Sequence, residues 1–432
     1  MNITQSEVQD GKLTATVTIP AADVDAAIKK AYKDAAHKYR FPGFRPGHAP
    51  RAVVDNMLGK GFGLVDATNR IINDAEPAII NELDIVPVKE HGDIDEESLE
   101  MVKDHEDYTY AITFALRPTP SLSSYDAVEI EMPPAEVTES EIDAQIEMLL
   151  GYHATFEDVE DRGIEDTDFV TAKVENIKNA EALAGDSRMI AMGSGNLPNA
   201  FDEGLMGMKV GETKEISWTP ETEGAEEAAV NVTVNGIKAR KLPELTDEFA
   251  KTGFGFDDIA TMRDAVKEEI AADKESRLPQ LKENRCVAKL AERLELDEMD
   301  KDYEQSVFQE LGQNFLQSLA ARGMSLDAWL QANGMTGDQF IADLHHQADD
   351  VARESLALDA LARELKVEVT DGDVDNEFKS AGVDDPEATK ERFVAEGRMP
   401  AVRDSIRRSK AVNWLVENAK VTEVDETAKD AE

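Results

Sequence analysis

One short stretch, residues 41–51, constrains the fold more than any other part of the sequence. Its sequence is Phe-Pro-Gly-Phe-Arg-Pro-Gly-His-Ala-Pro-Arg, with proline at positions 42, 46 and 50 and glycine at 43 and 47. Proline fixes φ and bars helix on both sides, while glycine permits backbone angles that other residues avoid. The pattern predicts a stiff, protruding loop with an exposed aromatic ring at Phe44 and guanidinium groups at Arg45 and Arg51.

The charge around this loop is opposite in sign to that of the whole chain. Between Lys29 and Lys60, five Lys and three Arg stand against two Asp, a local balance of +6. The 432-residue chain has 90 Asp and Glu against 46 Lys and Arg, a formal net charge of −44. A basic island in an acidic chain indicates a polyanionic partner at the island, whereas the overall charge argues against unspecific binding to nucleic acid.

Length and composition predict a soluble, cytoplasmic protein of about three domains. Cys286 is the one cysteine, which excludes an intramolecular disulfide and fits a reducing compartment. The first residues lack the basic and apolar regions of an export signal, and no run approaches the roughly 18 apolar residues of a membrane span. We therefore expect neither an export signal nor a membrane span.

The N-terminal pattern predicts an α+β unit. Leu13, Ala15, Val17 and Ile19 alternate with threonine, which indicates a half-buried strand that ends at Pro20. Apolar spacing then predicts a helix from about residue 23 to the loop, a short helix from residue 50 to 57, and a long helix over 65–83 with a kink at Pro77. Two further strands, 85–89 and 108–116, would complete a sheet that the helices cover on one face.

The rest of the chain is predicted to contain a connecting helix, then a segment rich in strands, and then a long helical segment. A turn-rich stretch leads to an acidic helix over 137–150, whose start at Thr138 and Glu141 is typical of a capping box. Residues 161–241 have the pattern of strands and turns with a short helix near 199–204. From about residue 245 to 418 the apolar residues follow a helical period, so these helices must pair to hide their apolar faces.

The loop resembles a known signature. Residues 43–50, Gly-Phe-Arg-Pro-Gly-His-Ala-Pro, match the GFRxGxxP motif of the bacterial trigger factor family at every fixed position. The resemblance implies that the loop contacts ribosomal protein and rRNA near the exit tunnel. The residues expected to make these contacts are Gly43, Phe44, Arg45, Pro46, Gly47 and Pro50. The alternative is an ordinary loop between two helices, capped by proline and glycine.

A second segment, residues 193–212, resembles an FKBP-type peptidyl-prolyl isomerase domain in its order of glycine turn, short helix and glycine turn. Such a domain needs no nucleophile or metal, because an apolar pocket favours the twisted form of the X-Pro amide over the planar one. The barrier without a catalyst is about 18 to 20 kcal/mol. The resemblance assigns Phe201, Leu197 and Val174 to this pocket, although Phe201 fits a core residue equally well.

The pocket departs from the family pattern at several positions. Val174 and Leu183 stand where the family has aromatic residues, and Lys173 stands where it has Asp. Residues 219–223, Thr-Pro-Glu-Thr-Glu, replace the usual Phe-Pro-Glu-Asp-Tyr. Pro198 occupies a position whose amide can bond a substrate carbonyl in the family, and proline has no N–H. We therefore expect the isomerase fold with weak activity.

The combined prediction is a multidomain α+β protein in trigger-factor order. The expected parts are a ribosome-binding domain (1–117), a connector (118–160), an FKBP-like β-rich middle domain (161–241), an all-α chaperone domain (242–421) and an acidic disordered tail (422–432). The resemblance implies an ATP-independent chaperone and prolyl isomerase in the cytoplasm that assists folding and export. It also implies that the C-terminal region lies spatially between the other two domains.

The expected partners are the ribosome near its exit tunnel and nascent or unfolded polypeptides. We expect no cofactor, no metal and no membrane partner, and a homodimer away from the ribosome is left open. Met299, Met324 and Met335 are candidate adaptable contacts for clients, with core filling as the alternative. The competing function is a stand-alone prolyl isomerase whose helices dimerise or tether it.

Overall fold

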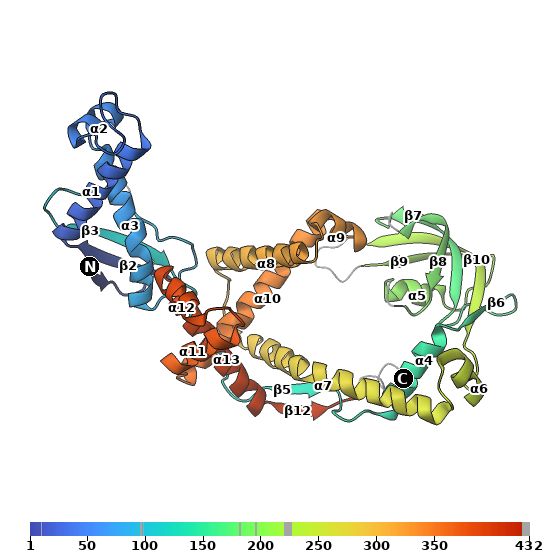
Figure 1. Cartoon of the computed structure of the whole chain (residues 1–432). Helices are drawn as coiled ribbons and strands as arrows, with labels where there is room; N and C mark the ends of the chain where they lie inside the picture. Colours follow the sequence, from blue (N-terminus) through green and yellow to red (C-terminus); the bar gives the residue numbers. More distant parts are fainter. Residues whose placement is uncertain are drawn as a thin grey trace. The chain divides into compact units, whose positions relative to one another are not determined.

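The structure is a computed structural model that describes residues 1–432 apart from 10, 96, 98, 181–182, 195–196, 220–226 and 426–432. The chain divides into two compact units. Unit 1 contains Met1–Met132 and Gln280–Thr422, and unit 2 contains Pro133–Pro279 and Glu423–Glu432. The boundary falls inside one long helix, α7 (Ile259–Ala291), at Pro279 (Figure 1). Unit 1 therefore joins the two ends of the sequence, and unit 2 holds its middle.

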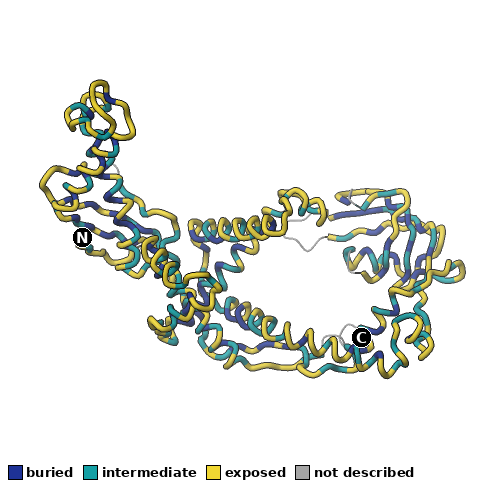
Figure 2. The backbone as a smooth tube through the Cα atoms, in the orientation of Figure 1, coloured by how far each residue is buried: buried dark blue, intermediate teal, exposed yellow. Residues whose placement is uncertain are grey.

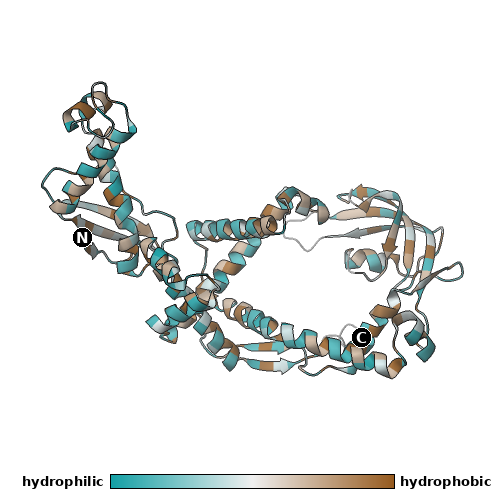
Figure 3. Ribbon diagram, viewed as in Figure 1, coloured by the Kyte–Doolittle hydropathy of each residue, from teal (hydrophilic) through white to brown (hydrophobic). Residues whose placement is uncertain are grey.

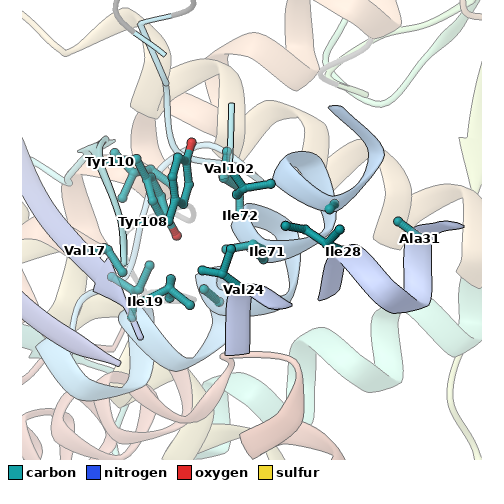
Figure 4. Packing of buried hydrophobic residues seen from close by; sticks show 14 of the residues in the cluster. Val17, Ile19, Val24, Ile28, Ala31, Ile71, Ile72, Val102, Tyr108 and Tyr110 are labelled. Carbon is teal, nitrogen blue, oxygen red and sulfur yellow. The ribbon is translucent and has the colours of Figure 1, made fainter. Parts of the chain in front are cut away.

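The N-terminal part of unit 1 is a three-stranded antiparallel sheet in the order β1-β2-β3, with helices packed on it. As predicted, alternate residues of the second strand, from Leu13 to Ile19, are buried. Figure 4 shows Val17 and Tyr110 from this sheet packed with Ile28 and Ile72 from two helices. The elements are β1 (Asn2–Gln5), β2 (Lys12–Ile19), α1 (Ala21–Lys38), α2 (Arg51–Leu58), α3 (Phe62–Leu83) and β3 (Tyr108–Ala115).

Two details of this part differ from the prediction. The strand predicted over 85–89 is reduced to an isolated bridge between Pro87 and Leu116, with one further bond from the Val88 N–H to the Ala115 carbonyl, 2.8 Å long. Pro87 has no N–H to donate to a neighbouring strand, so the pairing with the end of β3 does not extend into a full strand. Strand β1 was not predicted, because its four residues have no apolar alternation: only Ile3 is half-buried.

The C-terminal part of unit 1 is helical, as predicted. Side-chain oxygens of Asp300, Ser325, Thr336, Thr370 and Asp385 cap the starts of five of its helices. The helices are α8 (Lys301–Ala321), α9 (Leu326–Ala332), α10 (Gly337–Glu364), α11 (Asp371–Ser380), α12 (Pro386–Ala395) and α13 (Met399–Asn418).

Two short strand pairs join segments that are distant in the sequence. Strand β4 (Ser121–Leu122) pairs with β11 (Leu294–Glu295), and β5 (Glu129–Met132) pairs with β12 (Lys420–Glu423). Thr422 and Glu423, which the sequence analysis assigned to a disordered tail, therefore lie in a strand. The partner strand β5 supplies the backbone bonds, and the predicted tail from 426 onward lies outside the described residues.

A network of ion pairs joins the N-terminal and helical parts of unit 1. Arg117 pairs with Asp359 on α10 at 3.1 Å and also with Asp404 on α13. Asp84, which ends α3, pairs with Arg403 at 2.7 Å and Arg407 at 3.1 Å. Burial raises the pKa of Asp359 even though two guanidinium groups face it. The network is therefore partly desolvated, where losing one partner is costly.

Unit 2 is built on a curled five-stranded antiparallel sheet (Figure 1). Strand β10 pairs with β7 on one edge and with β9 and then β6 on the other, and its register shifts between Val234 and Gly236. Helix α5 packs against β9 and buries Phe201 and Leu205. The strands are β6 (Thr155–Asp158), β7 (Phe169–Lys178), β8 (Gly185–Ala191), β9 (Thr213–Trp218) and β10 (Ala228–Lys241), and the helix is α5 (Asn199–Leu205).

The remainder of unit 2 is helical and holds the connector against α7. Helix α4 (Glu139–Gly151) begins with the predicted capping box between Thr138 and Glu141, and α6 (Asp247–Phe249) and a π-helical turn (Ala250–Phe254) follow the sheet. The buried ammonium of Lys274 on α7 pairs with Glu141 at 2.6 Å and donates to the carbonyls of Pro134 and Glu136. The predicted class, a multidomain α+β protein with a β-rich middle and a helical C-terminal part, is confirmed.

Candidate functional site

The signature loop is built from two consecutive turns behind a buried anchor. Phe41 is 4% exposed and belongs to the core of the N-terminal sheet. The Phe44 N–H donates to the Phe41 carbonyl at 3.1 Å, and the His48 N–H donates to the Arg45 carbonyl at 3.0 Å. Phe44 is 42% exposed, and Arg45 is also exposed. In Figure 2 the end of the N-terminal part around α2, where this loop lies, is drawn largely in the colour of exposed residues. The loop thus presents an apolar ring and a guanidinium side by side to solvent.

Gly47 locks this loop onto the end of α1. Its N–H donates to the Ala36 carbonyl at 2.8 Å, and its φ of +81° lies in the left-handed region. An added Cβ would lie 2.1 Å from Cε1 of His37, so the imidazole ring occupies the space that a side chain would need. Gly43 also has a positive φ, +85°, but has no atom within 4 Å of such a Cβ. Glycine is therefore favoured at position 47 by its φ, and a side chain there would also have to displace the exposed His37 ring.

The two guanidinium groups predicted together have different roles. Arg51 pairs with Asp104 at 2.7 Å and lies 4.7 Å from the centre of the Tyr32 ring, and the bond to Asp104 raises the pKa of Arg51. Arg45 makes no ion pair with any residue that the structure describes. Arg51 therefore holds helix α2 in place, and Arg45 is the guanidinium that stays available to a partner.

The residues predicted to form a prolyl pocket share one hydrophobic core in unit 2. Val174 on β7 is 3% exposed, Phe201 on α5 is 1% exposed, and Leu197 is half-buried against them. Leu183, at another expected aromatic position, packs on the same core. Lys173 points to the opposite face, where it pairs with Glu175 at 2.6 Å. Val174 and Phe201 thus have almost no surface with which to contact a substrate.

An aromatic residue that the sequence analysis did not single out lies beside them. The ring of Trp218, at the end of β9, meets Phe201 edge-on with their centres 6.0 Å apart. Trp218 immediately precedes Thr219, and the rest of the predicted 219–223 segment lies outside the described residues. The alternation of β9, in which Ile216 is buried, could have placed Trp218 on the core side.

The helical part of unit 1 contains two cavities with mixed linings. One of about 480 Å³ lies between α8, α9 and α10 and is lined by Phe315, Trp329, Met335 and Phe340 together with Asn314 and Asp343. The second, of about 630 Å³, is lined mainly by α8, α10 and α13, with Ser306, Gln309 and Gln313 among its polar residues. Hydrophobic and hydrophilic residues alternate along these helices (Figure 3).

The three predicted methionine contacts have different surroundings. Met299 is 8% exposed and packs with Tyr303 in a core, so it fills space. Met324 is 41% exposed, and Met335 lines the smaller cavity. Among the described residues, no group of three or more His, Cys, Asp or Glu could hold a metal ion, and none of their helices is long and apolar enough to cross a membrane.

Two family models match this chain: "Bacterial trigger factor protein (TF)" over residues 1–149 and "Bacterial trigger factor protein (TF) C-terminus" over 258–417. The trigger factor of Lysinibacillus sphaericus (strain C3-41) is 32% identical over 96% of this chain and 99% of its own length. That of Halothermothrix orenii is 28% identical over 97% and 99%. A solved trigger factor chaperone structure aligns over 96% of this chain and 99% of its own, with 20% identity and a TM-score of 0.39.

We predict that Gly47→Ala destabilises the loop more than Gly43→Ala. Both changes force alanine into the left-handed region, which costs about 1 to 2 kcal/mol. Only the first also displaces the His37 ring and strains the bond from residue 47 to the Ala36 carbonyl. Amide hydrogen exchange, corrected for residue type, should show position 47 losing protection in the first variant alone. Equal exchange at position 47 in both variants would show that His37 does not confine the loop.

Proposed function

The chain belongs to the bacterial trigger factor family, and we propose that it is a ribosome-associated chaperone that holds newly synthesised polypeptides in an open state without nucleotide. Its place of action is the cytoplasm, at the ribosomal exit tunnel, where it assists folding and export. The observation that carries this proposal is the exposed pair Phe44 and Arg45 on a loop that Gly47 and Phe41 hold rigid. The parts are those proposed above, from the ribosome-binding domain 1–117 to the helical chaperone domain 242–421.

The loop has the chemistry of a docking element. An exposed guanidinium forms charge-assisted bonds to carboxylate or phosphate, and an adjacent aromatic ring adds apolar contact area. Rigid anchors lose little conformational entropy on binding, which favours a preformed tip over a flexible one. Gly43, Pro46 and Pro50 set the backbone of this tip, whereas Phe44 and Arg45 would make the contact.

We predict that Phe44→Ala combined with Arg45→Ala abolishes most ribosome binding. Central anchors of this kind contribute about 2 kcal/mol or more when truncated, roughly a 30-fold loss of affinity. Cosedimentation with ribosomes measures the effect. The matched control is Leu316→Ala with Arg322→Ala, since Leu316 is 49% exposed and exposed Arg322 makes no ion pair with a described residue. Unchanged cosedimentation of the loop variant would refute the docking role.

The helical part of unit 1 supplies surfaces for holding a client. Its cavities combine aromatic and methionine walls with amide and hydroxyl groups, so they can accept apolar side chains while satisfying a peptide backbone. The aromatic wall is ordered, because Phe315 contacts Trp329 edge-on at 5.0 Å and Phe340 at 5.1 Å. We propose that this wall is one place where unfolded segments bind.

We predict that Trp329→Ala weakens client holding several-fold without affecting ribosome binding. Aromatic anchors in a concave site account for a large share of binding energy. The measurement is suppression of aggregation of a denatured client without nucleotide, as a function of chaperone concentration. Phe44→Ala is the control, because it removes an aromatic ring from the docking loop instead. Equal suppression by the wild-type protein and Trp329→Ala would exclude the cavity as a client site.

We also propose that the middle domain, 161–241, is an FKBP-type prolyl isomerase with reduced activity. The burial of Val174 and Phe201 supports the reduction, since a pocket needs accessible walls. Each aromatic contact missing from the pocket would remove about 0.5 to 1.5 kcal/mol beyond burial. Several such losses multiply, because each 1.36 kcal/mol is about tenfold in rate.

We predict that the full chain turns over a short X-Pro peptide a few orders of magnitude more slowly than an ordinary FKBP-type enzyme. A protease-coupled assay measures the rate. Phe201→Leu keeps the core filled and serves as the comparison, because Phe201→Ala would cost about 3 to 5 kcal/mol of stability by itself. Ordinary turnover that Phe201→Leu abolishes without unfolding would contradict the proposal, because it would show that Phe201 belongs to a working pocket completed by side chains other than Val174 and Leu183.

A further inference from the structure

One face of helix α1 carries cations that the rest of the described chain leaves unneutralised. Lys29, Lys30 and Lys33 are exposed, and none of them makes an ion pair with another described residue. At 100° per residue these positions span an arc of about 100°. They therefore form a single stripe, called here the α1 lysine stripe.

Packing fixes the direction of this stripe. Val24, Ile28, Ala31, Tyr32 and Ala35 bury the other side of α1 in the core of the N-terminal sheet. Because that apolar face cannot leave the core without a large cost, the three ammonium groups are held toward solvent.

Three acids of the N-terminal part, two of them on α1, bond other residues. Asp34 pairs with Arg70 at 2.6 Å, and Asp25 pairs with His105 at 2.7 Å. Asp55 accepts a bond from the Tyr32 hydroxyl at 2.8 Å. These bonds direct the three carboxylates to other partners, and the balance over residues 29–60 stays at +6 with Asp34 and Asp55 included, although the whole chain carries a net charge of −44.

The stripe continues into the signature loop. His37 lies one turn beyond Lys33 on the same side of α1, and its ring packs against Gly47. Arg40 and Arg45 follow, both exposed and without an ion pair among the described residues. From Lys29 to His37 the helix rises about 12 Å, so the cations extend well beyond the loop.

We propose that the α1 lysine stripe binds the phosphate backbone of ribosomal RNA beside the docked loop. This proposal rests on the ribosome association proposed above. Lysine is a compact, adaptable cation that binds phosphate as a point charge, and charges repeated along a helix suit a ligand with charges repeated along its backbone. A strongly acidic chain is repelled by RNA as a whole, so its attachment requires a dense local cluster of this kind.

The test compares two triple variants of equal net charge. Lys29→Gln, Lys30→Gln and Lys33→Gln together remove the stripe. The control changes Lys267, Lys301 and Lys379 to Gln, which are exposed on α7, α8 and α11 and make no ion pair with a described residue. Affinity for purified ribosomes is measured at several salt concentrations between 50 and 200 mM.

Loss of three phosphate contacts should lower the salt slope by about 2 to 3, at roughly 0.7 to 0.9 per contact. Between 50 and 200 mM salt, the affinity of the wild-type protein and of the control should then fall about 20- to 40-fold more than that of the stripe variant. If the stripe variant keeps the wild-type dependence of affinity on salt, the proposal is overturned. This holds even if the variant binds more weakly, because weaker binding with an unchanged salt slope would indicate a contact with ribosomal protein instead of phosphate. A wild-type chain that fails to bind ribosomes would overturn both proposals, whereas Phe44- and Arg45-dependent binding with no effect of the stripe would overturn this one alone.

Discussion

The excess of acid decides where the cations of this chain are used. With 90 Asp and Glu for 46 Lys and Arg, many bases of this chain form an ion pair, although exposed lysines such as Lys267, Lys301 and Lys379 form none with a described residue. Lys274 forms an ion pair that holds the connector against α7. Arg117, Arg403 and Arg407 form ion pairs that join the N-terminal and helical parts of unit 1. Residues 29–60 are the contrast, since Arg51 is the base there that forms an ion pair with a described residue. Residues 29–60 differ in the density of unpaired cations, and this density is the feature that indicates a partner.

Rigidity gives this unpaired charge a defined position. A flexible basic loop would lose conformational entropy on docking, and its cations would find intramolecular acids first. Phe41 fixes one end of the loop in the core, and the bond from the Gly47 N–H to the Ala36 carbonyl fixes the other. The geometry therefore explains the two glycines of the motif: both have a positive φ that favours glycine, and a side chain at position 47 would also have to displace the His37 ring.

Local patterns predicted the elements that are determined locally. The alternation of β2, the end of α1 ahead of the signature loop and the capping box at Thr138 depend on residues within a few positions of one another, and all three are confirmed. The pairing of Leu294 with Leu122 and the bond between Arg51 and Asp104 join distant residues, and neither has a local signature. The same limit applies to the candidate pocket, where resemblance brought Phe201 and Val174 together but could not show that both would be buried, with the Trp218 ring against Phe201.

The candidate surface for ribosome docking and the candidate surface for client holding would bind by different kinds of interaction. This difference would let one chain bind and release the two partners separately. Contacts made by Arg45 and the α1 lysine stripe would be electrostatic and exposed, so they would weaken steeply as salt rises. Contacts in the cavity walled by Phe315, Trp329 and Phe340 would come mainly from apolar burial, which salt does not screen. A change that releases the ribosome need not release the client. Such a separation follows if docking rests on the cations of residues 29–45 and holding rests on the cavity between α8, α9 and α10.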